Sequence, residues 1–465
     1  MYKITKEGEK REELVRRTYN RKETHEIRLY GLGGNDEFDI SGEVKKGIRI
    51  RIIGGSGSDK ITDKSKVSGI AEYTKVYDYT GEENKLDIGN EADDNTEDVP
   101  EVNAYDRVGY KFPFLSPKLS FAYNVDDGLF LGGGAFYRTF GFRKEPYATQ
   151  HTFTANYAVK TGAFNFRFEG DYKQLFGKWD LNLTAAVMGP QYLLNYFGLG
   201  NDTKPVPGHE LDKDIEFYRV KFRQISVQPL LTKNLKSYLR IGIGPTFDHF
   251  DVQRTPGRYI STDEADVTPG IFDASRFVGG RFFANLGAAT NQVNPRLGVH
   301  WYNEASYNYG LSGTTDKFTR LGSELKFYWS PVFPFQATLA VRAGGNTIIG
   351  DFPFYQANTL GGLSNLRGYR RTRFAGRSNV YNNIEARIEL FKFNVYLFPG
   401  KFGIMGLMDH GRVFAGNDEH DGIFTDWHRG FGGGIWIDVL KQAVVTTTYT
   451  VGEEKLLNVT FGFLY

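Results

Sequence analysis

Apolar and polar residues alternate along most of this chain, and the alternation is clearest at its end. Period-two alternation sends successive side chains to opposite faces of a β-strand. Over residues 457–465 one face carries only apolar side chains, namely Leu457, Val459, Phe461, Phe463 and Tyr465. The other face carries Asn458, Thr460 and Gly462, with Leu464 as the one apolar exception. An apolar face that ends in an aromatic residue suits a strand that faces lipid.

The same alternation recurs in residues 164–173, 179–185, 325–329 and 335–342. In the clearest of these segments, 164–173, aromatic side chains alternate with polar and charged ones. Backbone polar groups inside a bilayer must all be paired, and a closed barrel is the only sheet without free edges. The pattern therefore predicts a membrane-spanning barrel rather than a soluble sheet.

The strand pattern covers residues 106–465 and predicts 16 strands, with a long interruption at 345–377. We expect strands near 117–125, 128–138, 150–160, 163–173, 178–187, 214–228, 235–247, 279–289, 294–308, 317–329, 334–344, 379–391, 400–410, 429–439, 442–451 and 455–465. Long polar connections alternate with short turns, which is typical of outer-membrane barrels. The predicted fold is all-β, a 16-stranded antiparallel transmembrane barrel preceded by a small β-roll-like module.

The amino-acid composition excludes several other classes of protein. The chain has 465 residues and a formal net charge of +2, which gives no case for a nucleic-acid partner. There is no cysteine, so disulfides and thiolate metal sites are excluded. We find no run of 18 apolar residues, which excludes a helical membrane protein. The first residues form no apolar signal segment, so we expect a mature or truncated chain if the protein lies in an outer membrane.

The region before the barrel divides into three parts. Residues 1–27 are a charged lead-in, 28–80 a small Gly/Asp-rich β module, and 81–105 an acidic linker. The module contains two copies of a Gly-(Asn/Ser)-Asp-x-(Phe/Ile) pattern, around Asp36 and Asp59.

This pattern looks like the repeat of calcium-binding parallel β-rolls. Carboxylate oxygens are ligands that Ca²⁺ prefers, so the candidate ligands are Asp36, Asp39, Asp59 and Asp63. The spacing of 23 residues between the copies argues against a tandem ladder of ions. The alternative is a set of Gly/Asp turns in a small β-roll or sandwich without metal.

The interruption contains Leu366-Arg367-Gly368-Tyr369, preceded by a Gly-Gly turn. Three other segments have matching patterns at the expected places: 123–134, 383–387 and 407–414. Together they resemble the BamA/TamA superfamily of bacterial outer-membrane assembly barrels, over about 106–465. The resemblance implies that the interruption is an infolded sixth extracellular loop. It also implies that Arg367 is anchored by Glu385 and Asp409. An exposed loop arginine is the alternative interpretation.

In this superfamily, assembly activity is thought to lie at the seam between the first and last strands. The resemblance places the seam at Leu119, Phe121, Tyr123, Phe461, Phe463 and Tyr465. Gly132, Gly133 and Gly134 lie in the second strand, where glycines weaken a sheet and permit curvature. The arginines at 370, 371, 373 and 377 make the loop base cationic. We leave open whether they serve lumenal acids, lipopolysaccharide phosphates or solvent.

Superfamily members that assemble proteins carry POTRA repeats before the barrel, and the N-terminal region here has a different pattern. It looks like the junction in fusions of a metallophosphoesterase with a BamA-like barrel. No phosphoesterase motif, His-Glu-x-x-His or Gly-x-Ser-x-Gly is present, so we expect no enzyme and no cofactor other than Ca²⁺ in the module.

The location expected from the resemblance is the bacterial outer membrane, with a periplasmic N-terminal module. The expected partners are outer-membrane lipid, lipopolysaccharide and other outer-membrane proteins or lipoproteins. The expected role is outer-membrane protein insertion or secretion, directly or as an accessory. A passive anchor, display barrel or structural subunit is the alternative, and a porin-like channel is a third.

Overall fold

A computed structural model describes the chain except residues 6–7, 70–71, 125–127, 212, 266, 269, 291–292, 314–316, 332–335, 396–397, 417–424, 441–442, 462 and 464–465. The described residues form two compact units, 1–111 and 112–465. No α-helix occurs in them, and no helix there is long and apolar enough to cross a membrane.

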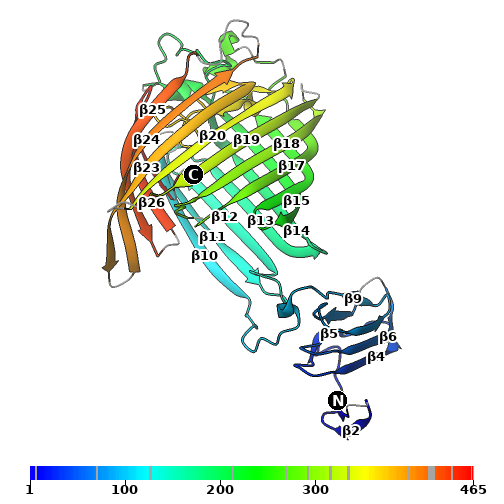
Figure 1. Ribbon diagram of the computed structural model, residues 1–465. Helices are drawn as coiled ribbons and strands as arrows, with labels where there is room; N and C mark the ends of the chain where they lie inside the picture. The colour runs from blue at the N-terminus through cyan, green and yellow to red at the C-terminus, as the bar shows by residue number, and fades with distance from the viewer. Residues whose placement is uncertain are drawn as a thin grey trace. The chain divides into compact units, whose positions relative to one another are not determined.

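The second unit is a closed antiparallel barrel whose 16 described strands follow one another in chain order (Figure 1). The strands are β10 (Phe114–Asn124), β11 (Gly128–Thr139), β12 (Thr149–Ala158), β13 (Phe164–Phe176), β14 (Trp179–Asn195), β15 (Arg219–Lys236), β16 (Leu239–Val252), β17 (Ser275–Ala289), β18 (Gly298–Ser312), β19 (Lys317–Trp329), β20 (Gln336–Gly350), β23 (Ser378–Val395), β24 (Phe398–Phe414), β25 (His428–Val439), β26 (Ala443–Val451) and β27 (Lys455–Phe461). The predicted fold class and strand number are confirmed. Several strands extend further than predicted, β14 as far as Asn195.

Alternate side chains line the inside and outside of the barrel, as the sequence pattern requires. On β24, Met405, Leu407 and Asp409 are buried on the inner face, whereas Ile404 and Met408 are exposed on the outer face. Exposed apolar side chains are expected on the outer face of a barrel that is solvated by lipid.

Connections at one end of the barrel pack into an apolar cluster. They contain η2 (Ile215–Tyr218), η3 (Tyr259–Ser261), η4 (Asp263–Ala265) and η5 (Phe354–Gln356). Buried side chains such as Tyr218, Ile260 and Phe277 join these connections to the strand ends. The long connections are therefore ordered by their own apolar core.

The first unit is a parallel β-roll. The chain alternates between a four-stranded sheet and a three-stranded sheet, so that successive coils stack in parallel register. The first sheet contains β3 (Glu26–Tyr30), β5 (Arg49–Ile53), β7 (Thr74–Tyr77) and β9 (Ala92–Asp94), and the second contains β4 (Glu37–Val44), β6 (Lys60–Val67) and β8 (Lys85–Ile88). Ile52, Ile61 and Val76 are fully buried between the sheets.

Gly31, Gly55 and Gly57 of the repeated pattern are required by close approach of neighbouring coils. A Cβ atom on Gly31 would lie 2.0 Å from the carbonyl oxygen of Gly54 in the next coil. The 23-residue spacing in the sequence is thus the length of one coil, and Glu37 pairs with Lys60. The prediction of a β-roll-like module is confirmed.

The predicted boundaries before the barrel differ from the structure. The lead-in contains a short hairpin, β1 (Tyr2–Ile4) with β2 (Lys10–Glu13). The segment predicted as an acidic linker, 81–105, is wrong in part, because it contains β8, β9 and η1 (Pro100–Val102). Its few apolar side chains, such as Leu86 and Ile88, complete the core of the roll, while its acids lie at turns and on the outside.

Candidate functional site: an infolded loop anchored by a buried charge cluster

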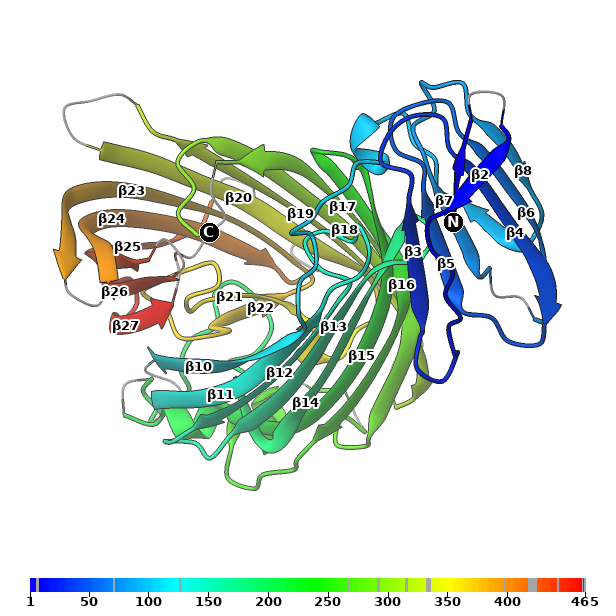
Figure 2. The ribbon, with the colours of Figure 1, turned by 90° about the horizontal axis from the view of Figure 1, so that it is seen from below.

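The loop between β20 and β23 folds back on itself and carries its own small hairpin. β21 (Asn358–Leu360) pairs with β22 (Phe374–Gly376). Both strands lie inside the outline of the barrel when it is viewed along its length (Figure 2). An apolar cluster attaches the loop to the wall strands and comprises Leu360, Leu366, Tyr369, Phe374, Tyr381 and Val413.

Arg367 of this loop is bound by two acids of the barrel wall, as predicted. Its Nε and Nη2 atoms donate to the two carboxylate oxygens of Asp409, each at 2.7 Å, and its backbone N–H donates to Asp409 Oδ2 at 2.9 Å. Its Nη1 atom donates to Glu385 Oε1. The Arg367 side chain is 3% exposed and both acids are fully buried. The alternative of an exposed loop arginine is therefore wrong.

A fourth charge, which we did not predict, completes the cluster. Arg387 lies two residues after Glu385 on β23 and donates to Glu385 Oε2 from Nε at 2.9 Å and from Nη2 at 2.6 Å. The two arginines and two acids have a formal sum of zero. A buried charge is stable only when it is paired and hydrogen-bonded, so each member of the cluster depends on the others.

The residues around Arg367 pack closely against β25 and the turn between β26 and β27. Gly368 has φ +89°, and a Cβ there would lie 2.7 Å from the backbone nitrogen of Gly452. Gly430 faces Arg367 so closely that a Cβ would lie 1.8 Å from the Arg367 carbonyl oxygen. Tyr369 donates its hydroxyl hydrogen to the Arg429 carbonyl at 3.2 Å. The motif residues Leu366, Arg367, Gly368 and Tyr369 all contribute to this fit.

Two of the cationic residues at the loop base are committed to ion pairs. Arg370 binds Glu454 and Arg373 binds Glu453, each through two guanidinium nitrogens at 2.6–2.9 Å. Both glutamates lie in the turn between β26 and β27. Sequence reasoning missed these partners because it treated that turn only as a connection.

The seam between β10 and β27 is narrow in the described residues. β10 pairs with β11 along its whole length, whereas its one pairing with β27 among the described residues is at Tyr123 and Val459. Leu119, Phe121 and Tyr123 lie in β10, and Phe461 ends β27, as predicted. Tyr465 lies outside the described residues.

The predicted place of Phe463 on the outer face of the last strand is wrong. The described part of the strand ends at Phe461, and Phe463 packs against the inner-face residues Trp436, Met405 and Leu407. The guanidinium carbon of Arg387 lies 3.8 Å from the centre of the Phe463 ring. Period-two alternation applies only while the chain remains paired, and here a cation–π contact inside the barrel replaces lipid contact.

The four candidate calcium ligands do not form one site. Asp59 Oδ1 accepts a hydrogen bond from the Asp36 backbone N–H at 2.8 Å, whereas Asp39 is exposed on β4 and Asp63 accepts from the Ser65 N–H. Across the described residues, no group of three or more His, Cys, Asp or Glu side chains is arranged to hold a metal ion.

Asp59 is nonetheless an unusual carboxylate. Its side chain is 1% exposed, and its Oδ2 atom has no hydrogen-bond partner. Burial raises the pKa of Asp59 to about 6, and repulsion by Asp78 and Asp36 adds to this effect. The pKa of Asp78 is also raised by burial. Asn84 occupies the ladder position in the next coil and accepts from the Asp59 N–H at 2.8 Å.

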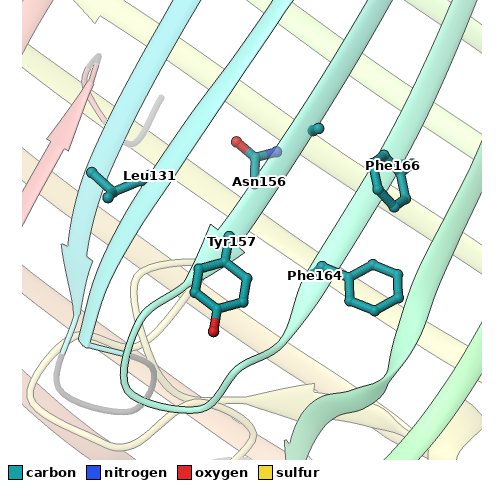
Figure 3. A pocket seen from close by; sticks show the side chains of 6 residues that line it. Leu131, Asn156, Tyr157, Phe164 and Phe166 are labelled. Carbon is teal, nitrogen blue, oxygen red and sulfur yellow. The ribbon is translucent and has the colours of Figure 1, made fainter.

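A shallow apolar hollow of about 390 Å³ lies over β11, β12 and β13 (Figure 3). Leu131, Tyr157 and Phe166 line it and are exposed on the outer face. Its position on the surface that meets lipid explains its apolar lining.

These features define a class: an outer-membrane β-barrel with an infolded, charge-anchored loop. Residues 285–438 match the Omp85 superfamily domain. This region runs from β17 to β25 and includes Arg367, Glu385 and Asp409. The match agrees with the resemblance indicated by the loop motif.

The fold is similar to that of the solved structure of BamA. BamA from Haemophilus ducreyi lacking POTRA domains 1–3 has a TM-score of 0.52 and 11% identity, covering 75% of this chain and 70% of that one. CdiB from Escherichia coli has a TM-score of 0.49 and 12% identity, covering 75% of this chain and 62% of that one. No curated protein matches the chain in sequence.

Proposed function

We propose that this barrel takes part in outer-membrane protein insertion or secretion, as the machine itself or as its accessory. The single observation that carries the proposal is the β10–β27 seam beside an anchored loop, a seam that in the described residues is paired only at Tyr123 and Val459. A strand edge with few ladder bonds is available to pair with another strand. The Omp85 domain and the BamA-like fold support the same function.

The proposal places the barrel in the outer membrane with the β-roll on the periplasmic side. Its partners are membrane lipid and other outer-membrane proteins or lipoproteins. Lipopolysaccharide is a further partner for surface cations, although Arg370 and Arg373 already have protein partners. We propose no enzymatic activity for this chain. A longer native protein with an upstream metallophosphoesterase would be compatible with this role.

Locking the seam tests the proposal. Tyr123→Cys and Val459→Cys lie opposite each other in the ladder, and the chain has no other cysteine. Opposed Cα atoms in an antiparallel pair are about 4.5–5.5 Å apart, which a disulfide can span. If the barrel inserts or secretes proteins, oxidation should lower the outer-membrane levels of its clients in cells, and reduction should restore them. The single variants under the same oxidant are the controls.

The alternative is a passive barrel that anchors or displays another domain, or a structural subunit of a complex. Such a barrel would tolerate the locked seam, and deletion would leave the levels of all other outer-membrane proteins unchanged. That pair of results would exclude insertion and secretion. A porin-like channel is tested by single-channel conductance of the purified barrel.

A further inference from the structure

The last strand, β27, is joined to the infolded loop directly before the strand, and through a charge of the wall strand β23 after it. Before the strand, Glu453 and Glu454 bind Arg373 and Arg370 of the loop. After the strand, Phe463 stacks on Arg387, whose guanidinium binds the same Glu385 that anchors Arg367. β27 is one side of the seam.

The upstream attachment is a pair of two-bond ion pairs with little exposure. The side chains of Arg370 and Arg373 are 9% and 3% exposed, and those of Glu454 and Glu453 are 13% and 28% exposed. The Glu454 backbone N–H also donates to the Gly368 carbonyl at 3.1 Å. Two-bond guanidinium–carboxylate pairs fix orientation as well as distance. The turn between β26 and β27 is therefore held in a fixed position relative to the loop base.

The downstream attachment connects the anchor to the chain after the last strand. Glu385 gives one oxygen to Arg367 and the other to Arg387, so the two arginines are held through one carboxylate. Arg387 then lies over Phe463, whose ring centre is 5.7 Å from that of Trp436. A change in the position of Arg367 is therefore expected to move Glu385 and Arg387, and so to weaken the contact of Arg387 with the Phe463 ring.

We infer that the infolded loop controls the seam by holding β27 directly before the strand, and through the Glu385–Arg387 pair of β23 after it. When the loop is anchored, β27 stays against β10; when the loop contacts are broken, the seam opens. The inference describes how the proposed insertion or secretion function is regulated, and its biological role therefore rests on that proposed function. Arg370, Arg373 and Arg387 are positioning residues in this account, because they act through β27.

The experiment measures seam closure directly in the full-length barrel, in detergent and in vesicles of outer-membrane lipid. The readout is the rate of disulfide formation between Tyr123→Cys and Val459→Cys. Adding Arg370→Gln with Arg373→Gln, or Arg387→Gln alone, should slow disulfide formation by about tenfold, the factor expected from loss of a charge-assisted bond. Arg281→Gln is the matched control, since its partner Glu304 lies on β18, away from the seam. It should leave the rate unchanged.

A charge exchange separates control of the seam from general stability. Arg370→Glu with Glu454→Arg should restore disulfide formation that Arg370→Glu alone slows, because the pair is re-formed in reverse. The inference is overturned if the Arg370, Arg373 and Arg387 variants cross-link at the parental rate while remaining folded. It is equally overturned if Arg281→Gln slows cross-linking as much as they do. If the locked seam leaves client levels unchanged but these variants still slow cross-linking, the proposed function fails and the inference on the seam stands.

Discussion

Arg367 and Asp409 form a buried two-bond ion pair across 42 residues of sequence, with both guanidinium–carboxylate distances at 2.7 Å. The pair joins the tip of an infolded loop to the barrel wall at β24. Only an arginine presents donors in a planar fork that matches a carboxylate in this way.

Replacing Arg367 should release the loop. Arg367→Ala leaves Asp409 buried and without its principal partner, which typically costs about 3–5 kcal/mol. We expect a lower unfolding temperature in detergent and faster proteolysis within residues 358–377. Arg367→Lys keeps the charge but not the fork, so it should fall between the parent and Arg367→Ala. Equal stability and equal protease resistance of the alanine variant and the parent would refute the anchor.

Glu385 should contribute more to the free energy of unfolding than an exposed glutamate of the barrel does. Glu385→Gln removes the charge that two buried arginines share, so we expect a loss of about 3–5 kcal/mol of unfolding free energy. Glu169→Gln is the control, because Glu169 and its partner Arg167 are both about half exposed. Exposed pairs contribute about 0–1 kcal/mol. Denaturant unfolding in detergent measures both variants, and similar losses for the two would contradict the shared role of Glu385.

Gly368 should not accept a side chain. Its positive φ and the close Gly452 backbone nitrogen, 2.7 Å from a built Cβ, predict that Gly368→Ala displaces the loop from the β26–β27 turn. Left-handed strain alone costs about 1–3 kcal/mol. Gly406→Ala is the matched control, since nothing lies within 4 Å of a Cβ there and the residue is on the outer face. Amide hydrogen exchange of the loop should rise only for Gly368→Ala.

The β-roll should become less stable as pH rises from about 4 to 6. Asp59 has a pKa raised to about 6 from 3.8, so in that window the folded roll binds the proton more tightly than the unfolded chain does. Asp59→Asn keeps the acceptor for the Asp36 N–H and removes the charge. It should stabilise the roll at pH 7.5 by about 1–2 kcal/mol, after allowance for solvent screening, and by much less at pH 4.

Hydrogen exchange of residues 49–67 in the full chain measures this effect, with Asp39→Asn as the exposed control. A chelator should leave exchange unchanged in both proteins. Protection of the parent by added Ca²⁺, lost in Asp59→Asn, would show instead that a cation offsets the buried charge.

Period-two alternation predicted every described barrel strand because lipid outside and charge inside impose it on each strand separately. The Arg367 anchor was predicted because one loop arginine and two wall acids stand in a recognisable order along the chain. Arg387 was missed since its partner, Glu385, was already assigned to another arginine. Only the three-dimensional arrangement shows that one carboxylate serves both.

The errors have a common physical cause. Residues 85–88 and 92–94 lie in a segment, 81–105, whose many acids predict a linker, although a coil of a roll needs only a few inward apolar residues. Alternation predicts the lipid face for Phe463 because the pattern is extended beyond Phe461, where the last described strand pair lies. In both cases a contact with a distant coil or strand, absent from any local pattern, decides the structure.

Strand length differs around the barrel. β23 has 18 residues, whereas β25 has 12. At about 3.4 Å per residue and a tilt of roughly 45°, these strands span about 43 and 29 Å along the membrane normal, against an apolar band of about 25 Å. β25 therefore matches the hydrocarbon closely, whereas β23 extends well beyond it, so that the ends of β23 meet lipid headgroups and water.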